Sequence, residues 1–160
     1  MTKSFLFLIM MSSFIAFGRQ AVSIETVPAA TAPTTPAVST GSLRVILKGF
    51  RNNDGETNVI LYKDAYTFPD KPDKCLSNLW TKVSKGYAEV TFPNVPYGEY
   101  ALAAYHDEND NHRLDLSVIG LPKEGIAISN DAKGLFLPRF KDAKIIINSP
   151  TKTIVMTIGY

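Results

Sequence analysis

The residues of this chain best suited to chemistry lie in one stretch, residues 105–125, with the sequence YHDENDNHRLDLSVIGLPKEG. With Asp107 as position one, oxygen donors recur at positions three, five, seven and nine. These donors are the side chains of Asp107, Asn109, Asn111 and Asp115, and the backbone carbonyl of Arg113. A loop that coils around an ion directs alternate side chains inward, and Ca²⁺ takes six to eight oxygen ligands. The spacing therefore predicts one structural Ca²⁺ held by these five residues.

The stretch departs from an EF-hand at two places. His112 stands at position six, where Gly is usual, and Val118 stands at position twelve, where a bidentate Glu is usual. Glu108, Asp110 and Glu124 are candidates for the missing ligand. We therefore expect an EF-hand-like loop of weak affinity, with a dissociation constant of ~10⁻⁴–10⁻³ M. The alternative is a hydrophilic turn whose Asn and Asp side chains cap their own backbone.

A catalytic interpretation of the same residues is a hydrolase with a cleft around His106, Asp107 and Glu124. Neighbouring residues on a strand point to opposite faces, so His106 and Asp107 are not expected to pair as base and orienting acid. Ser129 lacks the context of an activated nucleophile. A zinc site from His106 and His112 lacks identifiable further ligands. A non-catalytic role is therefore favoured, with no catalytic residue assigned.

Composition restricts the class of protein. The chain has 160 residues, enough for one domain with its own core, and 17 Lys and Arg residues against 15 acidic ones. No basic run is present, so no nucleic-acid partner is expected. Cys75 is the only cysteine, which excludes an internal disulfide.

The first residues have the pattern of a secretory signal peptide. Lys3 supplies a positive charge, residues 5–17 form an apolar run, and Ala16 and Gly18 fit a cleavage site. The run is shorter than the roughly 20 apolar residues that cross a bilayer. We expect a signal peptide at 1–18, secretion or bacterial periplasmic localisation, and no integral membrane segment after cleavage.

The region that follows is rich in Pro, Thr and Ala, and it lacks the apolar side chains that would offset its ordering entropy. It predicts a disordered spacer at 19–41. From Ser42 onward the pattern alternates with period two, and a β-domain is expected at 42–160.

The predicted fold is all-β, a single sandwich of about seven strands. The turn signal at 52–55 predicts that residues 42–50 and 57–63 form a hairpin. Residues 64–80 predict a long loop with a short helical turn near 76–80. Its aromatic residues are expected either to cover the core or to offer a ligand platform; they are Tyr62, Tyr66, Phe68 and Trp80. The expected core positions are Leu43, Val45, Leu47, Val59, Leu61, Val90, Phe92, Leu102, Ala104, Ile145, Ile147, Ile154 and Met156.

Two resemblances support this interpretation. The segment FPNVPYGEY resembles a corner of transthyretin-like and carboxypeptidase-regulatory-like (Ig-like) sandwiches. The segment 92–131 is similar to the signature of the bacterial exported family termed domain of unknown function 2141, although His112 replaces its usual Gly. The matching residues are Pro96, Gly98, Tyr100, His106, Asp107, Asn109, Asn111, Leu114, Asp115, Gly120, Pro122, Glu124, Gly125, Ser129 and Asn130.

The resemblance implies an exported β-domain and supplies no activity. We therefore expect a non-catalytic binding or accessory module of the cell envelope, whose partner is an envelope protein or a glycan.

Overall fold

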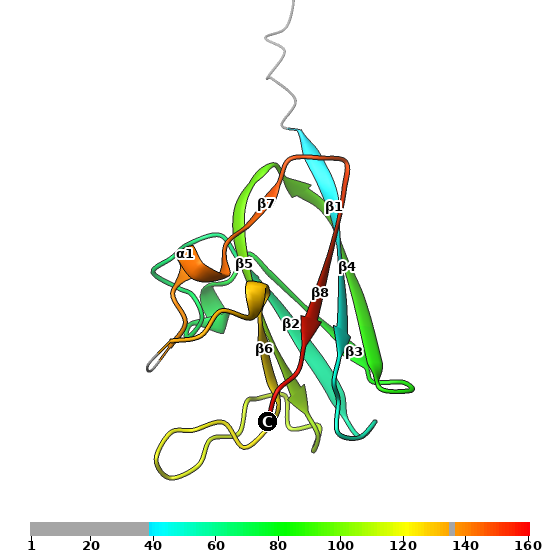
Figure 1. The fold of residues 1–160 in the computed structure, drawn as a ribbon, viewed down its shortest axis with the longest axis vertical. Helices are drawn as coiled ribbons and strands as arrows, with labels where there is room; N and C mark the ends of the chain where they lie inside the picture. The colour runs from blue at the N-terminus through cyan, green and yellow to red at the C-terminus, as the bar shows by residue number, and fades with distance from the viewer. Residues whose placement is uncertain (1–38, 135–136) are drawn as a thin grey trace, which may run out of the picture. The chain divides into compact units, whose positions relative to one another are not determined.

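The computed structural model describes residues 39–134 and 137–160, which form two packed β-sheets (Figure 1). The all-β sandwich is confirmed. The expected signal peptide at 1–18 and most of the spacer lie outside the described residues. The strands are β1 (Thr40–Lys48), β2 (Glu56–Tyr62), β3 (Ser77–Lys82), β4 (Tyr87–Pro96), β5 (Gly98–Asp107), β6 (Ile126–Ile128), β7 (Ile145–Ile147) and β8 (Thr151–Thr157).

The first sheet has the order β4-β1-β8, with β1 antiparallel to β4 and parallel to β8. The second has the order β3-β2-β5-β6, and β7 pairs with the beginning of β5. After β8 the chain crosses to the second sheet, where Gly159 pairs with Ile126. The C-terminus therefore joins the two sheets at the edge next to β6.

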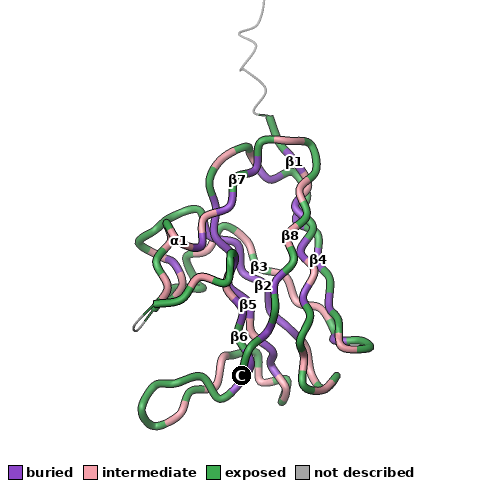
Figure 2. The backbone as a smooth tube through the Cα atoms, in the orientation of Figure 1, coloured by how far each residue is buried: buried purple, intermediate pink, exposed green. Residues whose placement is uncertain are grey.

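The main core lies between the sheets, where alternate residues of each strand point inward. On β1, Leu43, Val45 and Leu47 are fully buried, whereas Arg44 lies outside the core. The inner surfaces of both sheets are accordingly lined by buried residues (Figure 2). Fully burying one such side chain contributes about 1.5–3 kcal/mol. The predicted core positions all belong to this cluster, with Ile154 only partly buried.

A second, smaller cluster covers the outer face of β2 and β5. Ile60, Tyr62 and Ala103 pack there against Phe68 and against the short helix α1 (Phe140–Ala143). Strands β2 and β5 are therefore buried on both faces, and their sequences are correspondingly continuous apolar runs rather than alternating ones.

The predicted hairpin of the first two strands is wrong. Strand β1 pairs with β4 and β8, and β2 pairs with β3 and β5, so the two strands belong to different sheets. The turn at 52–55 carries the chain from one sheet to the other. Gly55 has a φ of 62°, and a Cβ there would stand 1.9 Å from the Asp107 carbonyl oxygen. A turn signal marks where the chain bends, but the partner strands depend on contacts made elsewhere.

The predicted helical turn at 76–80 is also wrong. Strand β3 occupies this region and pairs with β2, while a 3₁₀ helix lies earlier, at Pro72–Lys74. The cause is the open edge of β2, whose unpaired backbone groups are satisfied by β3. Of the aromatic residues noted in this region, Tyr62 and Phe68 are buried and Trp80 is half-buried, whereas Tyr66 is exposed.

Candidate metal-binding loop

The candidate site is the loop between β5 and β6, residues 108–125, which projects from one end of the sandwich (Figure 1). Strand β5 ends at Asp107, the first predicted ligand. The loop also contacts strand β3, which lies two strands from β5 in the sheet, because His112 packs edge-on against Trp80 with ring centroids 4.7 Å apart. The end of the second sheet therefore positions the beginning of the loop.

Asp107 is fully buried and organises the first turn of the loop. Its Oδ1 accepts the N–H of Asn111 at 3.1 Å, and its Oδ2 accepts the N–H of His112 at 2.7 Å. His112 has a φ of 58°, the left-handed conformation that Gly provides at this position of a calcium loop. His112 therefore adopts the backbone conformation that a Gly would provide at this position.

Asp115 closes the second half of the loop. Asn109 donates Nδ2–H to its Oδ2 at 2.9 Å, and Asn111 donates Nδ2–H to its Oδ1 at 3.1 Å. These bonds from Asn109 and Asn111 hold the pKa of Asp115 below its ordinary value, because they stabilise the charged carboxylate. The structure thus brings the four predicted side-chain ligands into one network. The Arg113 side chain is exposed, and its Nε lies 3.7 Å from Asp115 Oδ1.

The two amides also bind the backbone. Asn109 Oδ1 accepts the N–H of Asn111 at 3.1 Å, and Asn111 Oδ1 accepts the N–H of Arg113 at 2.9 Å. Such bonds coil the chain tightly and direct alternate side chains to one side. The described loop is therefore a closed hydrogen-bonded turn, and a cation would have to replace the amide N–H groups now facing Asp115.

Glu124 has a role that sequence reasoning missed. It is buried, its Oε1 accepts the N–H of Glu108 at 3.2 Å, and its Oε2 accepts the N–H of Asp115 at 3.0 Å. Both oxygens thus bind backbone groups at the two ends of the turn. Glu124 acts as a clamp, and the Pro-Lys-Glu-Gly segment that carries it is fixed behind the turn.

Among residues 39–134 and 137–160, no three His, Cys, Asp or Glu side chains are grouped as a metal site. The candidate donor set has two carboxylates, from Asp107 and Asp115, and otherwise neutral oxygens. Such a set is composed entirely of hard donors, which suit Ca²⁺ better than Zn²⁺.

His106 is fully buried and cross-links two distant segments. Its Nε2 donates to the Asp54 carbonyl oxygen at 2.7 Å, so its Nδ1 accepts the Tyr160 hydroxyl proton at 2.8 Å. The Tyr160 oxygen in turn accepts the N–H of Arg51 at 3.2 Å. Within the described chain no hydrogen bond joins His106 to Asp107 or Glu124. The three residues named for a hydrolase are thus engaged separately.

An ion pair reinforces this cross-link. Arg51 Nε lies 2.8 Å from Glu108 Oε1, and Asn52 donates Nδ2–H to Glu108 Oε2 at 3.1 Å. Burial tends to raise the pKa of Glu108, but the bonds from Arg51 and Asn52 outweigh it and leave the pKa below its ordinary value. These partners lie more than 50 residues apart in sequence, so no local pattern signals them.

Other residues of the family signature serve the framework. Tyr100 donates its hydroxyl proton to the Pro96 carbonyl at 2.7 Å, which closes the β4–β5 corner. Ser129 is fully buried, and its Oγ accepts the Leu102 N–H at 2.9 Å and donates to the Ala143 carbonyl at 2.5 Å. Its hydroxyl is therefore committed to holding β5 and α1 together.

Gly125 is required by close packing. A Cβ at this position would stand 2.4 Å from Ile158 and 2.5 Å from the Tyr160 ring. The glycine therefore lets the C-terminal residues lie directly against the end of the loop. The signature thus describes the loop and the segments that hold it.

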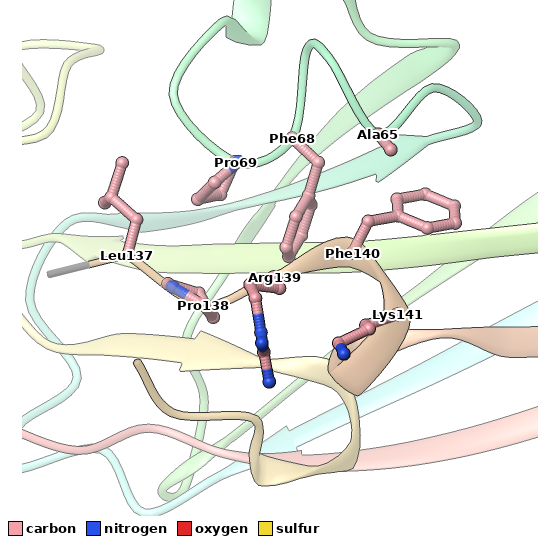
Figure 3. A pocket seen from close by; sticks show the side chains of 8 residues that line it. All are labelled: Ala65, Phe68, Pro69, Leu137, Pro138, Arg139, Phe140 and Lys141. Carbon is pink, nitrogen blue, oxygen red and sulfur yellow. The ribbon is translucent and has the colours of Figure 1, made fainter. Parts of the chain in front are cut away.

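Shallow hollows lie on the outer face of the second sheet and beside the end of the loop. The first, of about 460 Å³, is on the outer face of the second sheet between Phe68, Leu137 and Phe140, with Arg139 and Lys141 at its rim (Figure 3). The second, of about 600 Å³, follows β6 and the C-terminal residues. Glu124 and Tyr160 border the second hollow, and both are already hydrogen-bonded: Glu124 accepts two backbone N–H groups, and the Tyr160 hydroxyl binds His106 and the Arg51 N–H.

The fold and the loop define a class: an all-β sandwich domain with a coiled polar loop at one end of its second sheet. Residues 45–155 match the family model described as "Uncharacterized protein conserved in bacteria (DUF2141)", and the chain belongs to this family. The resemblance seen in the sequence is thereby confirmed. No curated protein and no solved structure matches the chain. No helix of the described residues is long and apolar enough to cross a membrane.

Proposed function

We propose that this chain is an exported, non-catalytic binding or accessory module of the bacterial cell envelope, and that its 107–115 loop holds a structural Ca²⁺. The signal-peptide pattern and the Pro/Thr spacer support export. One observation carries the calcium proposal. The side chains at positions one, three, five and nine meet in a single network around a left-handed turn at His112.

The proposed ion takes the place of hydrogen bonds that now stabilise the Asp107 and Asp115 carboxylates. Two side-chain amide N–H groups donate to Asp115, and two backbone N–H groups donate to Asp107. The loop therefore already places partial positive charge beside both carboxylates. Rotation of the Asn109 and Asn111 amides would present oxygen instead of nitrogen to a cation. The Arg113 carbonyl and water complete the shell. The role is structural, because the loop joins β5 to β6 and fixes the segment carrying Glu124.

Thermal melts in EDTA and in excess calcium test this proposal. A ligand at 100 times its dissociation constant stabilises by about 2.7 kcal/mol. For a domain of this size, that corresponds to a rise in Tm on the order of 10 °C. Asp115→Ala should abolish the rise and remain folded in EDTA. Asp73→Ala, an exposed aspartate on the 3₁₀ helix, should keep it. Identical wild-type melts, with no calcium heat in calorimetry, would refute the calcium site.

A non-catalytic role is proposed because the candidate acid–base residues are buried and already hydrogen-bonded. His106, Asp107 and Glu124 are buried, and their polar atoms are engaged by backbone groups or by Tyr160. No observation favours the alternative hydrolase. Turnover of ester, glycoside or phosphate substrates that is lost in His106→Ala would overturn the proposal. Direct binding of an envelope protein or a glycan would support it.

A further inference from the structure

The tip of the β5–β6 loop, residues 116–122, is apolar and open to solvent. Its four large apolar residues are Leu116, Val118, Ile119 and Leu121, exposed by 52%, 105%, 80% and 60%. The loop that carries them projects from one end of the sandwich, and much of its length is exposed (Figure 2). Large apolar side chains exposed together mark a surface that meets a partner or a membrane.

The backbone of this tip is hydrogen-bonded within itself. Ser117 N–H donates to the Leu121 carbonyl at 2.7 Å, Gly120 N–H donates to the Ser117 carbonyl at 2.9 Å, and Leu121 N–H donates to Ser117 Oγ at 3.0 Å. Gly120 has a φ of 82°, which the turn requires. Three backbone N–H groups of the tip are thus paired within it, which lowers the cost of placing them in the interfacial layer of a membrane. The turn is also preformed, so its insertion costs little ordering entropy.

Charged residues lie on both sides of the apolar tip in the sequence. Residues 116–122 carry no charge, and Arg113 and Lys123 flank them with exposed side chains. The flanking acids Asp115 and Glu124 are charged and hydrogen-bonded within the loop, Glu124 is buried, and Arg113 Nε lies 3.7 Å from Asp115 Oδ1. Asp110 is the exposed acid of the preceding turn. An apolar tip with basic side chains at its base fits the acyl region and the phosphate layer of an anionic bilayer.

We propose that the apolar tip inserts into the interfacial layer of an anionic lipid membrane, with Arg113 and Lys123 at the phosphates. A second copy of the chain is a poorer occupant. Four side chains on a convex tip are far fewer than the roughly 20–30 residues a side of a stable protein interface. A fluid lipid layer can surround a convex tip on every side, whereas a flat protein surface cannot. This proposal does not depend on the calcium site.

Vesicle binding of the full chain tests the proposal at the tip itself. An environment-sensitive fluorophore is attached to the cysteine of an Ile119→Cys variant made in a Cys75→Ser background. Val155→Cys, a site 56% exposed on β8, carries the same label as a matched control. With vesicles of phosphatidylcholine and phosphatidylglycerol, the label at 119 should brighten and shift to the blue, and the label at 155 should not. The site-specific signal separates the tip from any contribution of the N-terminal residues.

Sedimentation with the same vesicles gives the magnitude. The double substitution Val118→Asp and Ile119→Asp should weaken the tip-dependent binding at least about tenfold, because two apolar side chains become charged. Arg113→Gln with Lys123→Gln should weaken it about tenfold on anionic vesicles and little on phosphatidylcholine alone. Circular dichroism and melting must show that each variant is folded. Val155→Asp should leave the binding unchanged.

Insertion at position 119 in either EDTA or calcium supports the proposal. Unchanged fluorescence of the label at position 119, with both vesicle types and in both EDTA and calcium, overturns the proposal. Binding of the tip to a soluble protein without this fluorescence change overturns it as well. Failure of the calcium proposal appears separately, in the melting curves.

Discussion

Glu124 is predicted to hold the loop together, and its substitution gives a measurable loss of stability. A hydrogen bond to a charged acceptor contributes about 1.5–3 kcal/mol, and a buried donor left unpaired adds a desolvation cost. Gln replaces one acceptor oxygen by an NH₂ group, so either the Glu108 or the Asp115 N–H loses its partner. We expect Glu124→Gln to lower the free energy of unfolding by about 2 kcal/mol and Glu124→Ala by about 3–4 kcal/mol.

The assay is urea unfolding in EDTA, so that metal does not contribute. The matched control is Glu99→Gln, because Glu99 is a half-exposed glutamate paired with Lys144 on the surface. That change should stay within about 0.5 kcal/mol. Amide hydrogen exchange should speed up at Glu108 and Asp115 in the Glu124 variants, because these two N–H groups lose their acceptor. A Glu124→Ala variant that loses less than about 1 kcal/mol, with both amides still protected, would refute the clamp.

Three further predictions concern the framework. Ser129→Ala should cost about 2–3 kcal/mol in urea unfolding, because a buried N–H and a buried carbonyl lose their shared partner; a cost as small as that of exposed Ser84→Ala would contradict this. Tyr160→Phe should cost about 1–1.5 kcal/mol, since His106 Nδ1 loses its donor, and unchanged stability would show that the bond is unimportant. The lowered pKa of Glu108 means that its stabilisation is complete above its unfolded-state pKa and is lost as pH falls through the lower folded-state pKa. Glu108→Gln should therefore flatten the fall of Tm from about pH 5 to pH 3, and an unchanged slope would refute this.

Much of the fold could be predicted from local pattern. Period-two alternation located β1 and β5, and a short run rich in β-branched and aromatic residues located β2. The core positions followed, because a residue's side of a strand depends only on its place in the alternation. Strand β3 was missed, since it follows directly on a stretch rich in Pro and Asp that is typical of a loop. The transthyretin-like arrangement stays a prediction.

The candidate site was likewise predictable from the sequence only in part. The spacing from Asp107 to Asp115 predicted that the four side chains gather, and they do, because a coiled loop brings nearby alternate residues together. The clamp by Glu124 and the cross-link through His106 were not predictable. Their roles depend on which atoms the fold places opposite them. Whether calcium binds the loop stays a prediction.

By itself, the sequence determined which residues face inward, where the chain turns and which oxygens the loop can gather. These properties depend on backbone preferences and on neighbours a few residues away. Only the tertiary structure decided that β1 lies beside β8, that His106 meets Tyr160, and that the turn at 52–55 joins two sheets instead of closing a hairpin. Such pairings join segments many tens of residues apart. They are selected by the packing of the whole core, because many strands have similar local patterns and only one arrangement buries all their apolar faces together.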